Sequence, residues 1–209
     1  MKILISGKPQ FLGRYLITLL KDHEVREDGR ASDFDCVFHL PIYEENENFN
    51  SYTHRAITGT INLCEAHPKK VILASSYSVY DLDNPVAHVK LCVEDILARY
   101  AQRQGFELII LRIGPMLGSY KGQKEKYLYS KAVNEFIEQA LAQKPLKIKN
   151  PDREMRYINI KDVAKTFINV WGRKVKIKDL ARRITLHESI REHIGFIKSS
   201  ENLYEKNKV

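Results

Sequence analysis

The chain has no long apolar run, no patterned cysteines and no cluster of metal-ligating residues, and each absence excludes a class of protein. No segment of the 209 residues approaches the roughly 20 apolar residues that a membrane helix requires. The opening apolar run, residues 2–6, is too short for the core of a signal peptide. The cysteines, which have no CxxC or Cys/His spacing, are Cys36, Cys64 and Cys92. We therefore expect a cytoplasmic protein without membrane segment, disulfide framework or metal site.

Charge is unevenly distributed along the chain. Residues 1–100 hold 11 Lys and Arg against 14 Asp and Glu, whereas residues 101–209 hold 23 against 12. A basic half can attract a nucleotide diphosphate or nucleic acid. Its cations are scattered along helical segments and are not interleaved with aromatic residues, so the pattern favours a solvated surface and does not favour nucleic-acid binding.

Buried strands alternate with amphipathic helices along most of the chain. Apolar runs rich in Ile, Leu and Val predict strands at residues 2–6, 35–40, 70–76 and 107–113. Helical spacing predicts helices at residues 11–20, 52–66, 86–104 and 129–142. This alternation predicts an α/β fold, a Rossmann-type doubly wound parallel sheet flanked by helices. The 44% hydrophobic composition suffices for one domain.

Two features of the first half depart from a full dinucleotide-binding unit. The first turn, residues 7–13, has Gly7 and Gly13 but places Gln10 where a GxxGxxG pattern expects glycine. Between the first helix and the strand at 35–40, residues 23–34 leave room for one small strand around Glu24 and Val25. A complete βαβ unit does not fit there. Dinucleotide binding is therefore expected to be weak or lost.

Eight ordered motifs carry a specific resemblance. They are MKILISG…FLG at 1–13, HEV at 23–25, DCVFHL at 35–40, GTINL at 59–63, SS…VY at 75–80, PVAHVKLCVE at 85–94, LRIGPMLG at 111–118 and YINIKDVA at 157–164. In this order they resemble the NAD-dependent epimerase/dehydratase family, within the extended short-chain dehydrogenases. The resemblance covers most of residues 1–170. It implies an NAD or NADP cofactor and a nucleotide-sugar substrate.

The resemblance implies a proton-transfer site that is incomplete in this chain. Ser76 and Lys90 match the family's substrate-orienting serine and its lysine, but the family tyrosine is replaced by Val86. An aliphatic side chain can neither give nor take a proton. His88 lies two residues along the helix, about 200° away from the face of Lys90. Tyr80 is the candidate substitute, and Tyr77 is the other tyrosine near this strand end.

The resemblance also suggests binding residues. For the cofactor it suggests Gly7, Gln10, Phe11, Leu12, Gly13, Asp28, Leu40 and Lys90. An acidic Asp28 suits ribose hydroxyls, whereas Arg26 and Arg30 suit a 2′-phosphate, so NAD and NADP both stay open. Arg112 and Arg156, with Arg153 nearby, are candidates for a substrate diphosphate because guanidinium groups match phosphate oxygens.

The C-terminal part is short compared with the family's substrate region. We expect a core at residues 1–170 and a reduced helical region and tail at 171–209, in the same domain, with helical spacing at 178–190. Family resemblance implies a homodimer through the helices at 52–66 and 86–104. Two hypotheses remain: a nucleotide-sugar enzyme using NAD or NADP, and a catalytically inactive Rossmann-fold binding or regulatory protein.

Overall fold

The computed structural model divides into two compact units. Unit 1 comprises Met1–Ile113 and Ala164–Leu180, and unit 2 comprises Gly114–Val163 and Ala181–Val209. The structure describes residues 1–7, 11–43, 47–117, 139, 142–145, 154–171, 177–180 and 182–185. The predicted boundary at residue 170, within one domain, stays a prediction.

A six-stranded parallel sheet forms the centre of unit 1, which confirms the predicted parallel sheet and adds a strand at residues 177–180 to those that were expected. Its strands are β1 (Lys2–Gly7), β2 (Glu24–Arg26), β3 (Cys36–Leu40), β4 (Lys70–Ser76), β5 (Glu107–Ile113) and β8 (Ile177–Leu180). They lie in the order β2-β1-β3-β4-β5-β8, and every neighbouring pair is parallel. Between β2 and β3 the described chain has only a 3-10 turn, Ala31–Asp33, so the short connection that the sequence predicted is confirmed.

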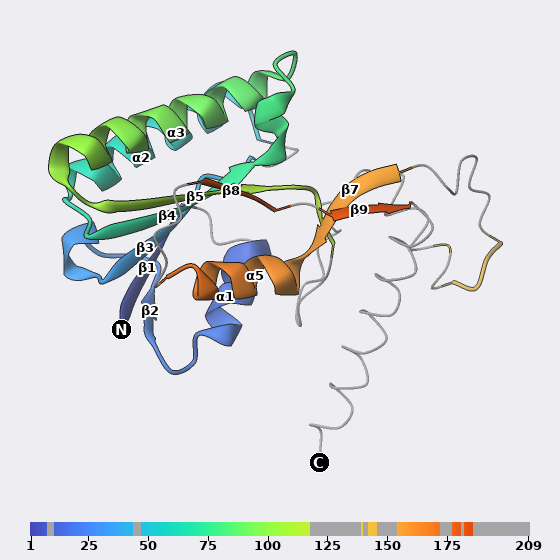
Figure 1. Ribbon diagram of the computed structural model, residues 1–209, viewed down its shortest axis with the longest axis horizontal. Helices are drawn as coiled ribbons and strands as arrows, with labels where there is room; N and C mark the ends of the chain where they lie inside the picture. Colours follow the sequence, from blue (N-terminus) through green and yellow to red (C-terminus); the bar gives the residue numbers. More distant parts are fainter. Residues whose placement is uncertain are drawn as a thin grey trace. The chain divides into compact units, whose positions relative to one another are not determined.

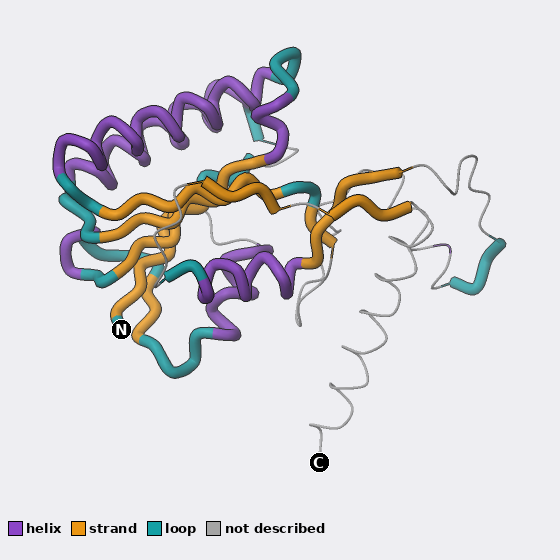
Figure 2. The backbone as a smooth tube through the Cα atoms, viewed as in Figure 1, coloured by secondary structure: helices purple, strands orange, loops and turns teal. Residues whose placement is uncertain are grey.

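Helices cover both faces of this sheet, which confirms the doubly wound α/β fold. The helices are α1 (Phe11–Leu19), α2 (Phe49–Glu65), α3 (Pro85–Gln104) and α5 (Ile160–Asn169). Helices α2 and α3 run side by side over one face, and α1 lies on the other (Figure 1). The part of α5 that belongs to unit 1 lies on the same face as α1, where Phe167 packs edge-on against Phe38 of β3 with ring centroids 5.3 Å apart. Figure 2 shows this layering by element type.

Alternating strand residues build the core between the sheet and the α2–α3 layer. Val37, Val71 and Leu73 point into the cluster that contains Tyr52 of α2 and Val93 of α3, and all five side chains are buried. The intervening residues, such as Phe38, face the opposite layer. Since both faces are covered, the strands are apolar on both sides, which is the pattern that identified them in the sequence.

Side-chain and glycine caps set the ends of α2 and α3. Asn48 Oδ1 accepts hydrogen bonds from the N–H groups of Asn50 and Ser51, so α2 begins at Phe49, three residues before the predicted start. Helix α3 begins at Pro85 and is stopped by Gly105, whose φ is 80°. These helices lie on unit 1 as the sequence predicted, with shifted ends.

Unit 2 contains a three-stranded sheet, and the helix expected from the spacing at 178–190 was wrong for the residues described there and at the edge of the larger sheet. Strands β6 (Met116–Leu117) and β7 (Glu154–Asn159) are parallel, and β7 pairs antiparallel with β9 (Arg182–Thr185). Residues 178–180 and 182–185 lie in β8 and β9, not in a helix; the apolar spacings of four and two residues there fit a strand's period as well. The predicted helix at 129–142 lies almost wholly outside the described residues.

Candidate active site

The end of β1 meets the end of β3 in a close backbone approach at Gly7. Gly7 has φ 98°, and a Cβ built there would lie 2.3 Å from the carbonyl oxygen of Leu40, its register partner in β3. Only glycine fits this position. From these neighbouring strands the chain continues to opposite faces, to α1 after β1 and to α2 after β3. This is the topological switch point at which α/β sheets bind ligands.

The other predicted cofactor residues have varied surroundings. Leu12 is fully buried in α1, so its side chain belongs to the core, and Gly13 is buried in the same helix. Asp28 is exposed two residues after β2, at the same edge of the sheet as Gly7. Gln10 lies outside the described residues, and Phe11 is described only as the first residue of α1. Among the predicted cofactor residues, Gly7 and Leu40 are thus the pair that the structure brings into close approach from two different strands.

His39, the residue before Leu40, is held neutral in a buried hydrogen-bond chain. Thr60 donates its hydroxyl proton to the Ala56 carbonyl at 2.6 Å and therefore accepts from His39 Nε2 at 2.9 Å. His39 Nδ1 then accepts from Ser6 Oγ, 3.2 Å away. Burial, reinforced by the charges of Lys90 and Arg55, lowers the pKa of His39 to about 3. His39 thus joins β1, β3 and α2 without carrying charge.

Lys90 brings a buried ammonium to the end of β3. Its side chain leaves α3, is only 5% exposed, and donates from Nζ to the Pro41 carbonyl at 2.5 Å. Burial, reinforced by the charge of Arg55, lowers the pKa of Lys90 to about 7, while Glu94 opposes the shift. The lysine that the resemblance singled out therefore lies at the switch point, with its charge poorly compensated.

Arg55 is a functional candidate that the sequence analysis missed. From α2 it donates to Glu47 through Nε (3.0 Å) and Nη2 (2.7 Å), and Nη2 also donates to the Ile42 carbonyl at 2.8 Å. Its guanidinium lies 5.7 Å from the ring centroid of Tyr52, a fully buried residue whose hydroxyl has no hydrogen-bond partner among the described residues. One signal could have found it: Arg55 is the only Lys or Arg between Arg30 and Lys69.

Ser76 and Val86 do not form the expected proton-transfer pair. Ser76 Oγ accepts from the Ser78 N–H at 3.1 Å and thereby caps the 3-10 turn Tyr77–Tyr80. Val86, in the first turn of α3, is partly buried and packs against the hydrophobic cluster. The hydrogen bonds of Ser76 and Lys90 go to Ser78 and Pro41, and within the described chain none joins them to a tyrosine.

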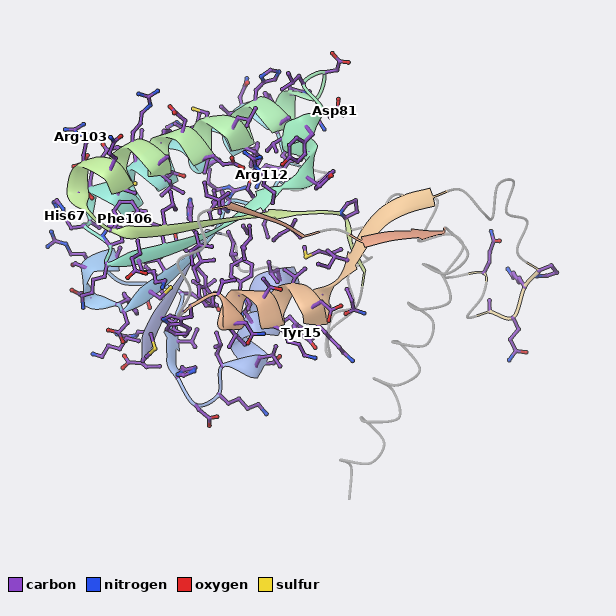
Figure 3. The ribbon with its side chains drawn as sticks, in the orientation of Figure 1. Tyr15, His67, Asp81, Arg103, Phe106 and Arg112 are labelled. Atoms are coloured by element: carbon purple, nitrogen blue, oxygen red, sulfur yellow. The ribbon has the colours of Figure 1, made fainter. Side chains whose placement is uncertain are left out.

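Arg112, a predicted diphosphate ligand, is hydrogen-bonded to side chains of its own unit. Its Nη2 lies 2.7 Å from Glu94 Oε2, and its Nη1 donates to the Tyr80 hydroxyl at 2.9 Å. Ser75 donates to Glu94 Oε1 at 2.5 Å and completes the cluster. In Figure 3 Arg112 lies between the sheet and α3. Tyr80, the candidate substitute for the family tyrosine, is 52% exposed beside it.

The remaining predicted residues lie in or near unit 2. Arg156 is in β7, opposite Arg183 of β9, and Arg153 lies outside the described residues. Among the described residues no three His, Cys, Asp or Glu side chains group in a way that could hold a metal. Of the helices described, none combines the length and apolarity needed to span a membrane.

Comparison with known proteins decides the family. The sequence profile of the NAD dependent epimerase/dehydratase family matches residues 14–179. The chain belongs to this family. The resemblance carried by the motifs is therefore confirmed.

This epimerase/dehydratase chain has a reductase among its relatives and shares its fold with a capsular polysaccharide assembling protein. The UDP-2-acetamido-2,6-beta-L-arabino-hexul-4-ose reductase of Pseudomonas aeruginosa is 25% identical over 98% of this chain, which spans 57% of that reductase. Capsular polysaccharide assembling protein CapF of Staphylococcus aureus matches with TM-score 0.67 and 21% identity, over 99% of this chain and 63% of CapF.

A structure with cofactor supports the same fold. UDP-glucuronic acid 4-epimerase of Bacillus cereus, solved in complex with NAD, matches with TM-score 0.71 and 19% identity, over 95% of this chain and 85% of the epimerase. These likenesses show the Rossmann-type fold. They also show that the chain spans little more than half the length of the Pseudomonas reductase.

Proposed function

We propose that this protein binds NAD or NADP at the switch point between β1 and β3 and uses it to reduce or epimerise a nucleotide sugar. The observation that carries the proposal is the buried Lys90 ammonium at the end of β3, beside the Gly7–Leu40 approach. A positive charge and a bare glycine turn at this edge suit a dinucleotide. The nicotinamide supplies or accepts hydride when bound.

The residues present fit such a cofactor. Gly7 removes the side chain from the turn at the β1 end, and Lys90 has three N–H donors, of which Pro41 takes one. Asp28 is an exposed carboxylate beyond β2, where ribose hydroxyls would need an acceptor. Arg26, the last residue of β2, is also exposed and would instead suit a 2′-phosphate.

The nucleotide-sugar substrate follows from the relatives and from charge. The reductase and epimerase named above have UDP-sugars in their names, and residues 101–209 are basic. Because Arg112 is bound by Glu94 and Tyr80, its geometry argues against a diphosphate role. Arg156 stays a candidate for the diphosphate because of its guanidinium group. We also retain a homodimer formed through the adjacent helices α2 and α3, testable by light scattering.

A catalytically inactive binding protein is the second candidate, favoured by the packing of Val86 against the core. If the protein is such a binding protein, the wild type binds cofactor without turnover. A Val86→Tyr variant would then gain measurable turnover, whereas Val86→Phe, which adds the ring without the hydroxyl, would not. Turnover by the wild type excludes this candidate.

Calorimetric titration with NAD, NADH, NADP and NADPH tests the cofactor proposal. We expect micromolar binding of at least one. If Asp28 holds the ribose hydroxyls, Asp28→Ala should lower the affinity for NAD about 10-fold or more. If Arg26 instead holds a 2′-phosphate, Arg26→Ala should lower the affinity for NADP by a similar factor. Arg99→Ala, on the exposed side of α3, is the control and leaves both affinities unchanged. Absence of binding at millimolar cofactor contradicts the proposal.

A further inference from the structure

We propose that Lys90 is itself the acid that delivers a proton to the substrate carbonyl oxygen, in the role that a tyrosine at position 86 would fill. The inference rests on the proposed function and names its proton donor. Neither residue expected at the proton-transfer site can donate the proton. Val86 is aliphatic and packs, partly buried, against the hydrophobic cluster, and the Ser76 hydroxyl caps a turn. Reduction of a carbonyl still requires a proton source.

The position of Lys90 supports this role. Its Nζ reaches the Pro41 carbonyl, directly after β3, the strand that borders the switch point together with β1. Pro41 takes one of three N–H donors, so two remain for a cofactor hydroxyl and a substrate oxygen. The side chain is 5% exposed, so bulk water has little access to the ammonium.

The charged groups around Lys90 keep its proton transferable. From α2, Arg55 adds a second cation; from β3, His39 is neutral and adds no charge at neutral pH. From α3 itself, Glu94 is the one counter-charge, and it is bound by Arg112 and Ser75. With the pKa of Lys90 lowered to about 7, the ammonium and the amine are both populated at physiological pH.

Atoms and electrons balance in the step. The carbonyl carbon would take a hydride from the reduced nicotinamide that the site would hold, and the C=O π electrons would move to the oxygen. That oxygen forms an O–H bond as one N–H bond of Lys90 breaks, and the N–H electron pair stays on the nitrogen. The resulting neutral amine takes a proton from water. Arg55 acts as a positioning residue, since its charge favours the proton's departure.

Nuclear magnetic resonance of lysine carbons tests the acid without any turnover. In protein labelled at lysine Cε, the Lys90 signal is assigned by its loss in Lys90→Arg. We expect it to titrate near pH 7, well below the ordinary range of a lysine side chain. Arg55→Gln should raise this pKa, and Arg99→Gln, an exposed arginine on α3, should leave it unchanged. A Lys90 pKa above 9 in the wild type overturns the proposal.

Activity and binding of Lys90→Arg then separate an acid from a cofactor ligand. Arginine keeps the charge and the donors but releases no proton near neutral pH. We expect cofactor affinity within a few-fold of wild type and a loss of kcat of about 100-fold or more. The wild-type kcat should fall as pH rises through 7, and Arg55→Gln should move that limb to higher pH.

Three outcomes contradict the role of Lys90. Retained kcat in Lys90→Arg reduces the lysine to a cofactor ligand. Loss of kcat in Tyr80→Phe with retention in Lys90→Arg assigns the acid to Tyr80. No cofactor binding by the wild type overturns the proposed function, and it is recognised separately because the Lys90 titration needs no cofactor. Circular dichroism and melting temperature confirm that each variant is folded.

Discussion

Glu94 of α3 and Arg112 of β5 form a two-pronged ion pair, with Arg112 Nη2 2.7 Å from Glu94 Oε2 and Arg112 Nε 3.1 Å from Glu94 Oε1. The side chains are 7% and 18% exposed, so little water can replace either partner. The pair joins the helix layer to the sheet beside Lys90.

Glu94→Gln should lower the free energy of unfolding by about 3 kcal/mol, because it leaves the Arg112 guanidinium mostly buried without a counter-charge. Urea unfolding measures the change. The neighbouring Asp95 supplies a matched control, since its ion pair with Arg99 is exposed on both sides. Asp95→Asn should unfold as the wild type does. Equal losses in the two variants would refute the assignment of the Glu94 pair as structural.

Two glycine-to-alanine changes should have opposite signs. Gly7→Ala forces a side chain into positive φ and onto the Leu40 carbonyl, so we expect a loss of about 3 kcal/mol or more. Gly59 lies in α2, where an added methyl group would have no atom within 4 Å, and Gly59→Ala should stabilise the helix by about 0.5–1 kcal/mol. Thermal melts of both variants decide this. A neutral Gly7→Ala would contradict the close β1–β3 approach.

His39 should make the protein sensitive to acid. Burial lowers its folded pKa to about 3, while the unfolded value stays near 6.5, so the unfolded state binds more protons between these values. Stability from this group is full above pH 6.5 and falls as pH drops. Between pH 6.5 and 5 the loss is about 2 kcal/mol.

A set of histidine variants checks that acid sensitivity. His39→Gln should flatten the fall in unfolding free energy between pH 6.5 and 5, although it starts from a lower stability. The exposed His54 on the same α2 layer is the control, and His54→Gln should keep the wild-type slope. An unchanged slope in His39→Gln would rule out His39 as the source.

Only one of the three cysteines should react with a thiol reagent in the native protein. Cys36 and Cys64 are buried, and burial raises the pKa of each thiol to about 12. Cys92 is exposed on α3. We expect one fast equivalent of Ellman's reagent in buffer and three in guanidinium chloride, with the fast one lost in Cys92→Ser. Fast reaction of two or more would mean that the core opens readily.

The sequence predicted the unit 1 sheet well because its strands are buried on both faces and therefore read as continuous apolar runs. Residues 35–40 and 70–76 are short apolar runs of this kind, and both contain the predicted strands. The edge strand β8 was misassigned because Leu180 and Ile184 are spaced by four residues, a spacing that a helix and a strand share.

The site was harder to predict than the fold, for a physical reason. Lys90 and Gly7 belong to motifs, so local sequence identified them. Arg55 is hydrogen-bonded to Glu47 and Ile42, which precede α2 in a polar segment without periodicity. Its positive charge also lowers the pKa of Lys90, a residue far along the chain, and no local pattern in the sequence indicates this. The commitment of Arg112 to Glu94 and Tyr80 likewise depends on three elements meeting in space.

The contact between Phe38 and Phe167 can form only late in synthesis, because Phe167 is translated after strands β1 to β5. A nascent chain that has emerged as far as Ile113 already carries β1 to β5, with α2 and α3 to cover one face. The aromatic residues that cover Phe38 on the other face, Phe167 and Trp171, are still to be translated. Until they leave the ribosome, the part of that face around Phe38, beyond the cover of α1, offers an apolar surface to chaperones and to other nascent chains.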